Sequence, residues 1–250
     1  MFDEGVRGSV TALPRDQQIN ELRTRMRQIQ SGTGSVTAAD VAALDVIAVP
    51  GGIGDLLPGG GLARGSVVGR RGSTGILAGL LAAATGAELW AAIVAGPRQR
   101  IGLLAVTEMG GRLDRLAVID ASGGDPLEIA AVLSDGIPMI VCDTSVTVPP
   151  KRAQALTAKI RGQRGVLVIT DRVSGLRPDV TLRARPVGYR GLGAGCGRVQ
   201  EVRVAVEVAG RNPPIRRGEI MLASDGSEGV RWSRTRPAES AAARRWTRAG

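Results

Sequence analysis

The residue types and spacing best suited to chemistry lie in a glycine-rich stretch near residue 70. The motif G-x-x-x-x-G-K-[ST], which holds nucleotide phosphates between a strand and a helix, can be aligned with residues 69–76. In that motif, backbone N–H groups and the helix N-terminus bind the phosphate oxygens. The spacing therefore predicts a phosphate loop, in degenerate form, at Gly69, Arg70, Arg71, Gly72, Ser73, Thr74, Gly75 and Ile76.

This segment lacks the side chains that phosphoryl transfer needs. Thr74 stands where the motif has its second glycine, Gly75 where it has lysine, and Ile76 where it has Ser or Thr. The lysine neutralises phosphate charge and the hydroxyl helps to hold Mg²⁺. We therefore expect no catalytic residue and no ATP or Mg²⁺ cofactor. A tight strand-to-helix turn is the alternative interpretation, and Lys151 or Lys159 could restore a phosphate contact only if folding brings it here.

Few other side chains are placed for catalysis. Asp143 ends the apolar run 138–143, although an isolated Asp at the end of a strand is more often a capping or turn residue. The chain has no histidine, and Cys142 and Cys196 are its only cysteines. We therefore expect no metal site, and a reduced core thiol at Cys142.

Alternating strand and helix patterns must position these residues. Apolar runs typical of buried strands occur at 65–69, 89–95, 116–120, 138–143 and 165–170. Helical stretches lie between them, at 74–85, 101–109, 126–135 and 150–164. This alternation predicts an α/β fold with a mostly parallel central sheet covered on both faces. Beyond residue 171, the runs 180–185 and 199–208 predict antiparallel strands at the sheet edge.

The chain is predicted to have three parts: an N-terminal helix and linker over 1–44, the α/β core with its β extension over 45–225, and an arginine-rich flexible tail over 226–250. The first helix carries a narrow apolar stripe, which packs either on its own domain or on a partner. Arginine and tryptophan in the C-terminal part are common interface residues. The partner-binding candidates are Ile19, Leu22, Met26, Ile29, Arg216, Arg217, Arg231, Trp232 and Arg234.

Composition narrows the classes of partner. The formal net charge of +10 favours nucleic acid, so weak DNA binding is one interpretation and a solvated basic tail is the other. Residues 76–97 are apolar enough to span a membrane, but the turn signal at 85–88 divides them into a helix and a strand, and no membrane partner is expected. Without a disulfide framework or signal peptide, the chain is expected in the cytoplasm.

Several motifs, in order, resemble the RecA core. The run 58–65 is similar to the Gly-Gly-Leu turn before the phosphate-loop strand, and 109–116 to the segment between the second and third core strands. The run 138–143 resembles the Walker B strand, with Asp143 in the acidic position. The resemblance implies a RecA-like P-loop core in which Gly96 replaces the acidic residue that activates water, and Thr170-Asp171-Arg172 replaces a nucleotide-sensing Gln.

A narrower resemblance lies in 186–198, followed by an alternating strand that ends at Gly210-Arg211. This segment is similar to the ImuA-type proteins, RecA-related accessory factors of the actinobacterial mutasome. The resemblance implies a non-enzymatic scaffold in error-prone translesion synthesis during the SOS response to DNA damage. Its implied partner is an ImuB-like Y-family polymerase homologue, with RecA as a second candidate and an error-prone C-family polymerase as an indirect one. A weak nucleotide-binding or DNA-binding regulator is the alternative.

Overall fold

The computed structural model describes residues 45–49, 51–96, 101–193, 196–210, 215–224 and 229–235. All of them belong to the compact unit that spans Val41–Gly250. The predicted N-terminal helix, with Ile19, Leu22, Met26 and Ile29, lies outside the described residues, as do residues 236–250.

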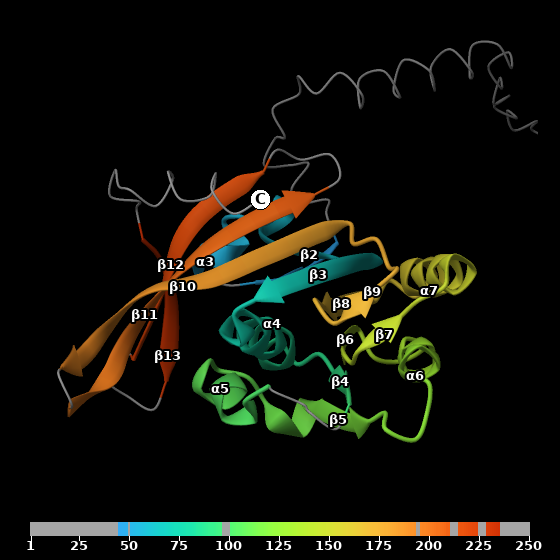
Figure 1. Ribbon diagram of the computed structural model, residues 1–250, viewed down its shortest axis with the longest axis horizontal. Helices are drawn as coiled ribbons and strands as arrows, with labels where there is room; N and C mark the ends of the chain where they lie inside the picture. The colour runs from blue at the N-terminus through green and yellow to red at the C-terminus, as the bar shows by residue number, and fades with distance from the viewer. Residues whose placement is uncertain are drawn as a thin grey trace, which may run out of the picture. The chain divides into compact units, whose positions relative to one another are not determined.

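A mixed sheet of nine strands organises the described part of this unit (Figure 1). Its order is β13-β12-β11-β10-β3-β8-β6-β4-β5, and the six neighbours from β10 to β5 are parallel. β11, β12 and β13 extend it as antiparallel neighbours. The strands are β3 (Ser66–Gly72), β4 (Ala91–Ala95), β5 (Leu116–Asp120), β6 (Met139–Asp143), β8 (Val166–Thr170), β10 (Val180–Gly193), β11 (Cys196–Gly210), β12 (Arg216–Ser224) and β13 (Val230–Thr235).

Helices and two short β ladders complete the described chain. The α-helices are α3 (Gly51–Gly54), α4 (Thr74–Gly86), α5 (Leu103–Glu108), α6 (Pro126–Leu133) and α7 (Pro150–Gly162). Two 3₁₀ turns are η1 (Pro58–Gly60) and η2 (Leu113–Arg115). One ladder pairs β1 (Val46–Ala48) with β2 (Gly61–Ala63), and the other pairs β7 (Val146–Thr147) with β9 (Val173–Ser174).

Two hydrophobic clusters hold the helices against the sheet. α3, α4 and α5 pack over one face, where the buried side chains include Leu77, Leu81 and Val106. α6 and α7 pack over the other face, around Leu127, Leu156 and Ile160 on the helices. Because β4, β6 and β8 are buried on both faces, they are continuous apolar runs instead of alternating ones.

The predicted α/β architecture with a mostly parallel core is confirmed. The apolar run 76–97 is divided between α4 and β4, and no helix among the described residues is long and apolar enough to cross a membrane. Two boundaries were wrong. β3 continues to Gly72 instead of ending at Gly69, because its last residues pair with β10. The tail assigned to 226–250 contains β13, an outer strand of the sheet.

Candidate functional site

The residues singled out for phosphate chemistry meet at one edge of the sheet. β3, β8, β6 and β4 are parallel, so their carboxyl ends share that edge. Arg70 pairs with Thr170 in neighbouring strands, and Ala95 pairs with Asp143. Ligands of parallel α/β sheets bind at the carboxyl ends of the strands, so this edge is the candidate site.

The connection from β3 to α4 is one residue long. Gly69–Gly72 belong to β3, Ser73 is the N-cap residue, and Thr74 begins the helix. A phosphate loop needs several consecutive backbone N–H groups that point at one anion between strand and helix. Residues 69–76 are therefore a tight strand-to-helix junction and do not form a loop.

Backbone contacts with β10 occupy this junction. The Ser73 amide donates a 2.8 Å hydrogen bond to the carbonyl oxygen of Ala184, so this N–H is not directed to a ligand. Gly72 has a φ of +86°, and a Cβ there would lie 2.1 Å from the same carbonyl oxygen. Only glycine allows this backbone conformation and this close approach. Gly72, a residue of the predicted phosphate loop, thus serves the pairing of β3 with β10.

The positions of the missing lysine and hydroxyl lie in the first turn of α4. Gly75 lies near the Leu222 side chain of β12, since a Cβ there would be 3.7 Å from Leu222 Cδ1. Ile76 is fully buried in the core between α4 and the sheet. A Ser or Thr side chain at this position would therefore meet apolar neighbours.

The two arginines of this segment point in opposite directions. Arg70 is 5% exposed and lies on the α4 side of the sheet, in register with Leu182. Its Nη1 donates to the carbonyl oxygen of Gly72, and its Nε has no hydrogen-bond partner among the described residues. Arg71 is exposed on the opposite face. Arg70 therefore places a guanidinium group beside the β3–α4 junction, where it binds the backbone.

Asp143 is buried and already has polar partners. Thr170 Oγ1 donates a 3.1 Å hydrogen bond to Asp143 Oδ1, and Arg172 Nη1 lies 3.9 Å from the same oxygen. At Gly96, the position of the missing acidic residue, a Cβ would have no atom of the described residues within 4 Å. The negative charge of the Asp143 carboxylate is thus balanced by the nearby Arg172 of the same chain.

Neither lysine is placed to replace the missing one. Both lie on α7, which packs over the sheet face opposite α4, and Lys159 Nζ lies 2.9 Å from Asp135 Oδ2. In the part of the chain that the structure describes, no group of three or more His, Cys, Asp or Glu residues could hold a metal ion. Cys142 is buried as expected, and desolvation raises the pKa of its thiol.

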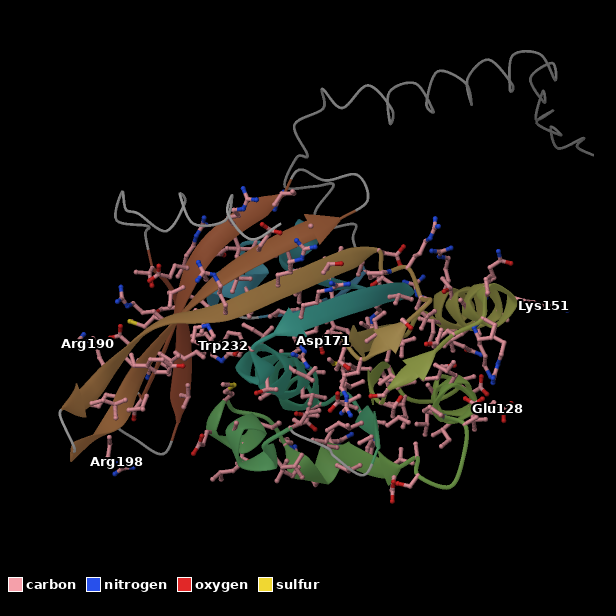
Figure 2. The ribbon with its side chains drawn as sticks, in the orientation of Figure 1. Glu128, Lys151, Asp171, Arg190, Arg198 and Trp232 are labelled. Carbon is pink, nitrogen blue, oxygen red and sulfur yellow. The ribbon has the colours of Figure 1, made fainter. Side chains whose placement is uncertain are left out.

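The C-terminal candidates belong to the sheet and do not all face solvent. Trp232 lies on β13 (Figure 2), where it pairs with Leu222. Its ring contacts Gly79 of α4. It is half-buried against the core cluster, so the flexible tail predicted to contain it is wrong at this position. Arg216 and Arg217 are exposed on β12, and Arg231 and Arg234 are exposed on β13.

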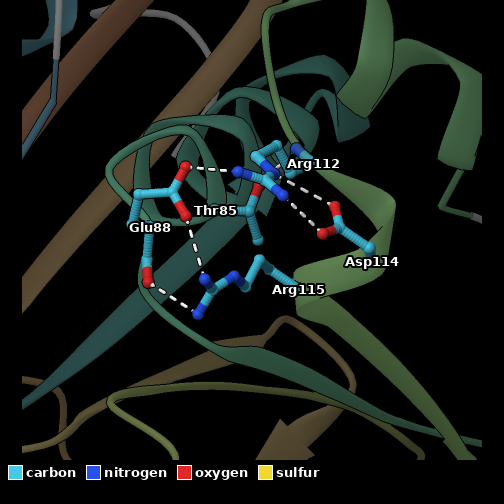
Figure 3. Close-up of polar contacts among 5 residues, drawn as sticks. All are labelled: Thr85, Glu88, Arg112, Asp114 and Arg115. Carbon is cyan, nitrogen blue, oxygen red and sulfur yellow. Dashed lines mark hydrogen bonds and ion pairs between the residues drawn. The ribbon is translucent and has the colours of Figure 1, made fainter.

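The segment 109–116 supports the opposite edge of the sheet (Figure 3). Glu88 forms ion pairs with Arg112 at 2.5 Å and Arg115 at 3.0 Å, and Arg112 also pairs with Asp114 at 2.6 Å. The hydrogen bond from Arg112 lowers the pKa of the Asp114 carboxyl. Thr85 Oγ1 accepts a 3.0 Å hydrogen bond from the Arg112 amide. Because these residues precede β4 and β5, the cluster fixes the amino ends of those strands.

A group of exposed arginines on β10 and β11 was not predicted from the sequence. Arg183, Arg185, Arg190 and Arg203 lie on one face of the sheet extension. The alternation of Val202, Val204, Val206 and Val208 with polar residues was a signal for this face, because it predicts a strand with one exposed side.

The described chain is thus an α/β domain with a mixed sheet and a closed strand-to-helix junction. Residues 55–175 match the family model for the MT3502 N-terminal domain. The chain is also 40% identical over 170 residues to the uncharacterized protein Rv3395c of Mycobacterium tuberculosis, across 63% of this chain and 81% of that protein. The protein belongs to the family of Rv3395c. The family model ends before β10, so the sheet extension lies outside it.

Proposed function

We propose that this protein is an ImuA-type, RecA-related accessory protein that acts in error-prone translesion DNA synthesis by binding an ImuB-like Y-family polymerase homologue. In this role it binds proteins and does not hydrolyse ATP. The arrangement of Arg70, Asp143 and Thr170 at one edge of a parallel sheet supports the RecA relationship, since the resemblance expects their segments in neighbouring core strands.

The one-residue junction between β3 and α4 is the main observation in support of a role without ATP hydrolysis. Phosphoryl transfer depends on positioning and on electrostatic stabilisation of the phosphates. Here the Ser73 amide is bonded to Ala184, Ile76 is buried, and Asp143 is bonded to Thr170. We therefore expect no phosphate release from ATP, with or without single-stranded DNA. Turnover that single-stranded DNA stimulates and that Asp143→Ala abolishes would contradict this expectation.

A groove next to α5 offers a surface for a protein partner. It has a volume of about 1260 Å³ and lies between α5 and the ends of β11 and β12, with Leu104, Met109 and Val202 in its lining. Leu104 is 70% exposed, and Val199 is 49% exposed at the same groove. Exposed apolar residues that gather in one place mark protein-binding sites more often than isolated ones do. The predicted stripe of Leu22 and Met26 offers a second anchor.

The partner proposal is tested by a binding assay with the purified ImuB-like protein. We expect Leu104→Asp to weaken binding at least about tenfold, because a desolvated carboxylate in an apolar contact costs more than 1.4 kcal/mol. Val132→Asp is the matched control, since Val132 is 69% exposed on α6, over the opposite face of the sheet. Leu22→Asp with Met26→Asp tests the helix, with Asn20→Asp and Thr24→Asp as control. Unchanged binding by both folded test variants would contradict these surfaces, and no binding by the parent would contradict the proposal.

Weak nucleotide binding is the second candidate function, and Arg70 favours it. Its buried Nε lacks a hydrogen-bond partner among the described residues, next to the start of α4. Calorimetry with ATP and Mg²⁺ distinguishes the two candidates. A micromolar site lost in Arg70→Gln would support nucleotide binding, whereas no heat and no rise in melting temperature would support the accessory role alone.

A further inference from the structure

One face of the sheet extension is open in the described chain. The buried cluster under α6 and α7 extends across β4, β6, β8 and β3, and contains no residue of β10–β13. Leu182, Val204, Val206 and Ile220 point instead to the α4 side. The opposite side of β10–β13 is therefore a sheet surface that no described helix covers.

Arginines dominate this surface, which we call the arginine face. Along each strand, every second side chain points to this face. Residues paired across neighbouring strands share a face, so these side chains form rows that cross the strands. Together with the end of β3, it carries seven exposed arginines: Arg71, Arg183, Arg185, Arg190, Arg203, Arg217 and Arg231. Its acidic residues are Glu201, Glu207 and Glu219.

The glutamates lie lower in this surface than the arginines. Glu207 is 3% exposed and accepts from Arg183 at 3.2 Å and from Arg217 at 2.9 Å. Glu201 is 9% exposed and accepts from Arg190 at 3.0 Å. The guanidinium groups bond to these buried carboxylates, yet the arginine side chains stay 52% (Arg183), 74% (Arg190) and 56% (Arg217) exposed. A ligand that approaches this face therefore meets positive charge first.

A bulge in β10 fits the same arrangement. Register shifts between Pro186 and Gly188, where Gly188 pairs with Arg203. A Cβ at Gly188 would lie 2.6 Å from Arg203 Nη2, so the guanidinium lies directly over the glycine backbone. The same guanidinium lies 3.7 Å from Glu219 of β12, so Arg203 is placed between two neighbouring strands of this face.

The spacing of positive charge on the arginine face suits the phosphate backbone of a nucleic acid. Alternate residues along a strand are about 6.6–6.8 Å apart and neighbouring strands about 4.8 Å apart, which distributes charge over a broad area. The residues described on this face include no aromatic side chain, since Tyr189 and Trp232 belong to the other side. Binding of single strands relies on aromatic stacking, whereas duplex DNA presents dense charge on its exterior.

We propose that the arginine face binds the phosphate backbone of duplex DNA without reading its sequence. This binding does not depend on the accessory role proposed above. Absence of binding to the polymerase-like partner would contradict the accessory role but not DNA binding. Absence of DNA binding would contradict the present proposal but not the accessory role.

The test uses the full-length chain and a fluorescent 30-base-pair duplex, with anisotropy measured across a salt series. The face variant combines Arg71→Gln, Arg185→Gln and Arg203→Gln, which leaves both partners of Glu207 in place. The matched control removes the same charge from α7 with Lys151→Gln, Arg152→Gln and Arg161→Gln. Figure 2 shows Lys151 at the far end of the molecule from Arg190.

We expect the face variant to bind at least about tenfold more weakly at 50 mM salt, and its plot of log K against log salt to be shallower by about 3. The control should stay close to the parent, and replacing the same three arginines with lysine should preserve the slope. Equal losses in the face variant and the control would overturn the proposal, because the effect would then come from net charge. Binding of polyglutamate but not duplex DNA would also overturn it.

A second measurement uses the parent protein and therefore does not require any variant to fold. Phenylglyoxal modifies exposed arginines, and mass spectrometry locates each modified position. Duplex DNA should protect Arg71, Arg185 and Arg203 in the parent protein and leave Arg161 reactive. Uniform protection, or none, would contradict the proposed face.

Discussion

The ring of Trp232 fills the space in which a side chain at Gly79 would lie. A Cβ built at Gly79 would be 1.4 Å from Cζ2 of Trp232, although the two residues are far apart in sequence. This contact joins β13 to α4, so the outermost antiparallel strand is attached to the helix that follows the first core strand.

Gly79→Ala should therefore destabilise the protein by about 1–3 kcal/mol, because the added methyl group displaces the Trp232 ring. Gly75→Ala is the control within the same helix, where a Cβ meets only ordinary contacts. Alanine stabilises a helix over glycine by roughly 1 kcal/mol, so the control should be neutral or more stable. Urea unfolding measures both, and equal effects would contradict the packing argument.

Deletion of residues 226–250 should lower the melting temperature, because it removes β13 and the Trp232 contact. Truncating a packed tryptophan to alanine costs about 3–5 kcal/mol, and half-burial of Trp232 places this loss near the lower value. Deletion of 236–250 keeps every strand that the structure describes and serves as control. Identical melting curves for the two deletions would show that β13 adds no stability.

Thr85→Val should cost about 1–2 kcal/mol of folding free energy. Thr85 is fully buried, and its hydroxyl accepts from the Arg112 amide and donates to the Leu81 carbonyl oxygen. Valine has the same shape but leaves that amide without its acceptor. Thr107→Val, at an exposed position of α5, should change stability by less than about 0.5 kcal/mol. Chemical denaturation of the two variants distinguishes these results.

The Cys142 thiol should resist alkylation in the folded protein. It is 0% exposed, and burial raises its pKa, so little reactive thiolate forms. In a Cys196→Ser background, a thiol reagent should react only after denaturant is added. Because the unfolded thiol ionises at lower pH than the folded one, this group should also reduce stability as pH rises above about 8.5. Rapid labelling without denaturant would contradict the burial of Cys142.

Sequence patterns predicted the centre of the parallel core because β4, β6 and β8 are short, apolar runs that contain β-branched residues, as in Val166–Thr170. They did not predict β12 and β13, in which charged residues such as Arg217 and Arg231 interrupt the apolar pattern. Only one side of these strands is buried, and the contacts of Trp232 come from α3 and α4. The end of β3 was missed for a similar reason, since pairing with β10 decides it.

The same pairing bears on how this protein could be re-engineered. The Gly72 backbone approaches Ala184 so closely that β3 and α4 are joined without spare chain. The substitutions Thr74→Gly, Gly75→Lys and Ile76→Thr would restore the letters of a nucleotide-binding motif but not the length of chain that curves around an anion. We expect that regaining a phosphate site would require inserted residues between Gly72 and Thr74, and thus a change in chain length. Any descendant that regained nucleotide chemistry by this route would therefore show an insertion in its alignment at this point.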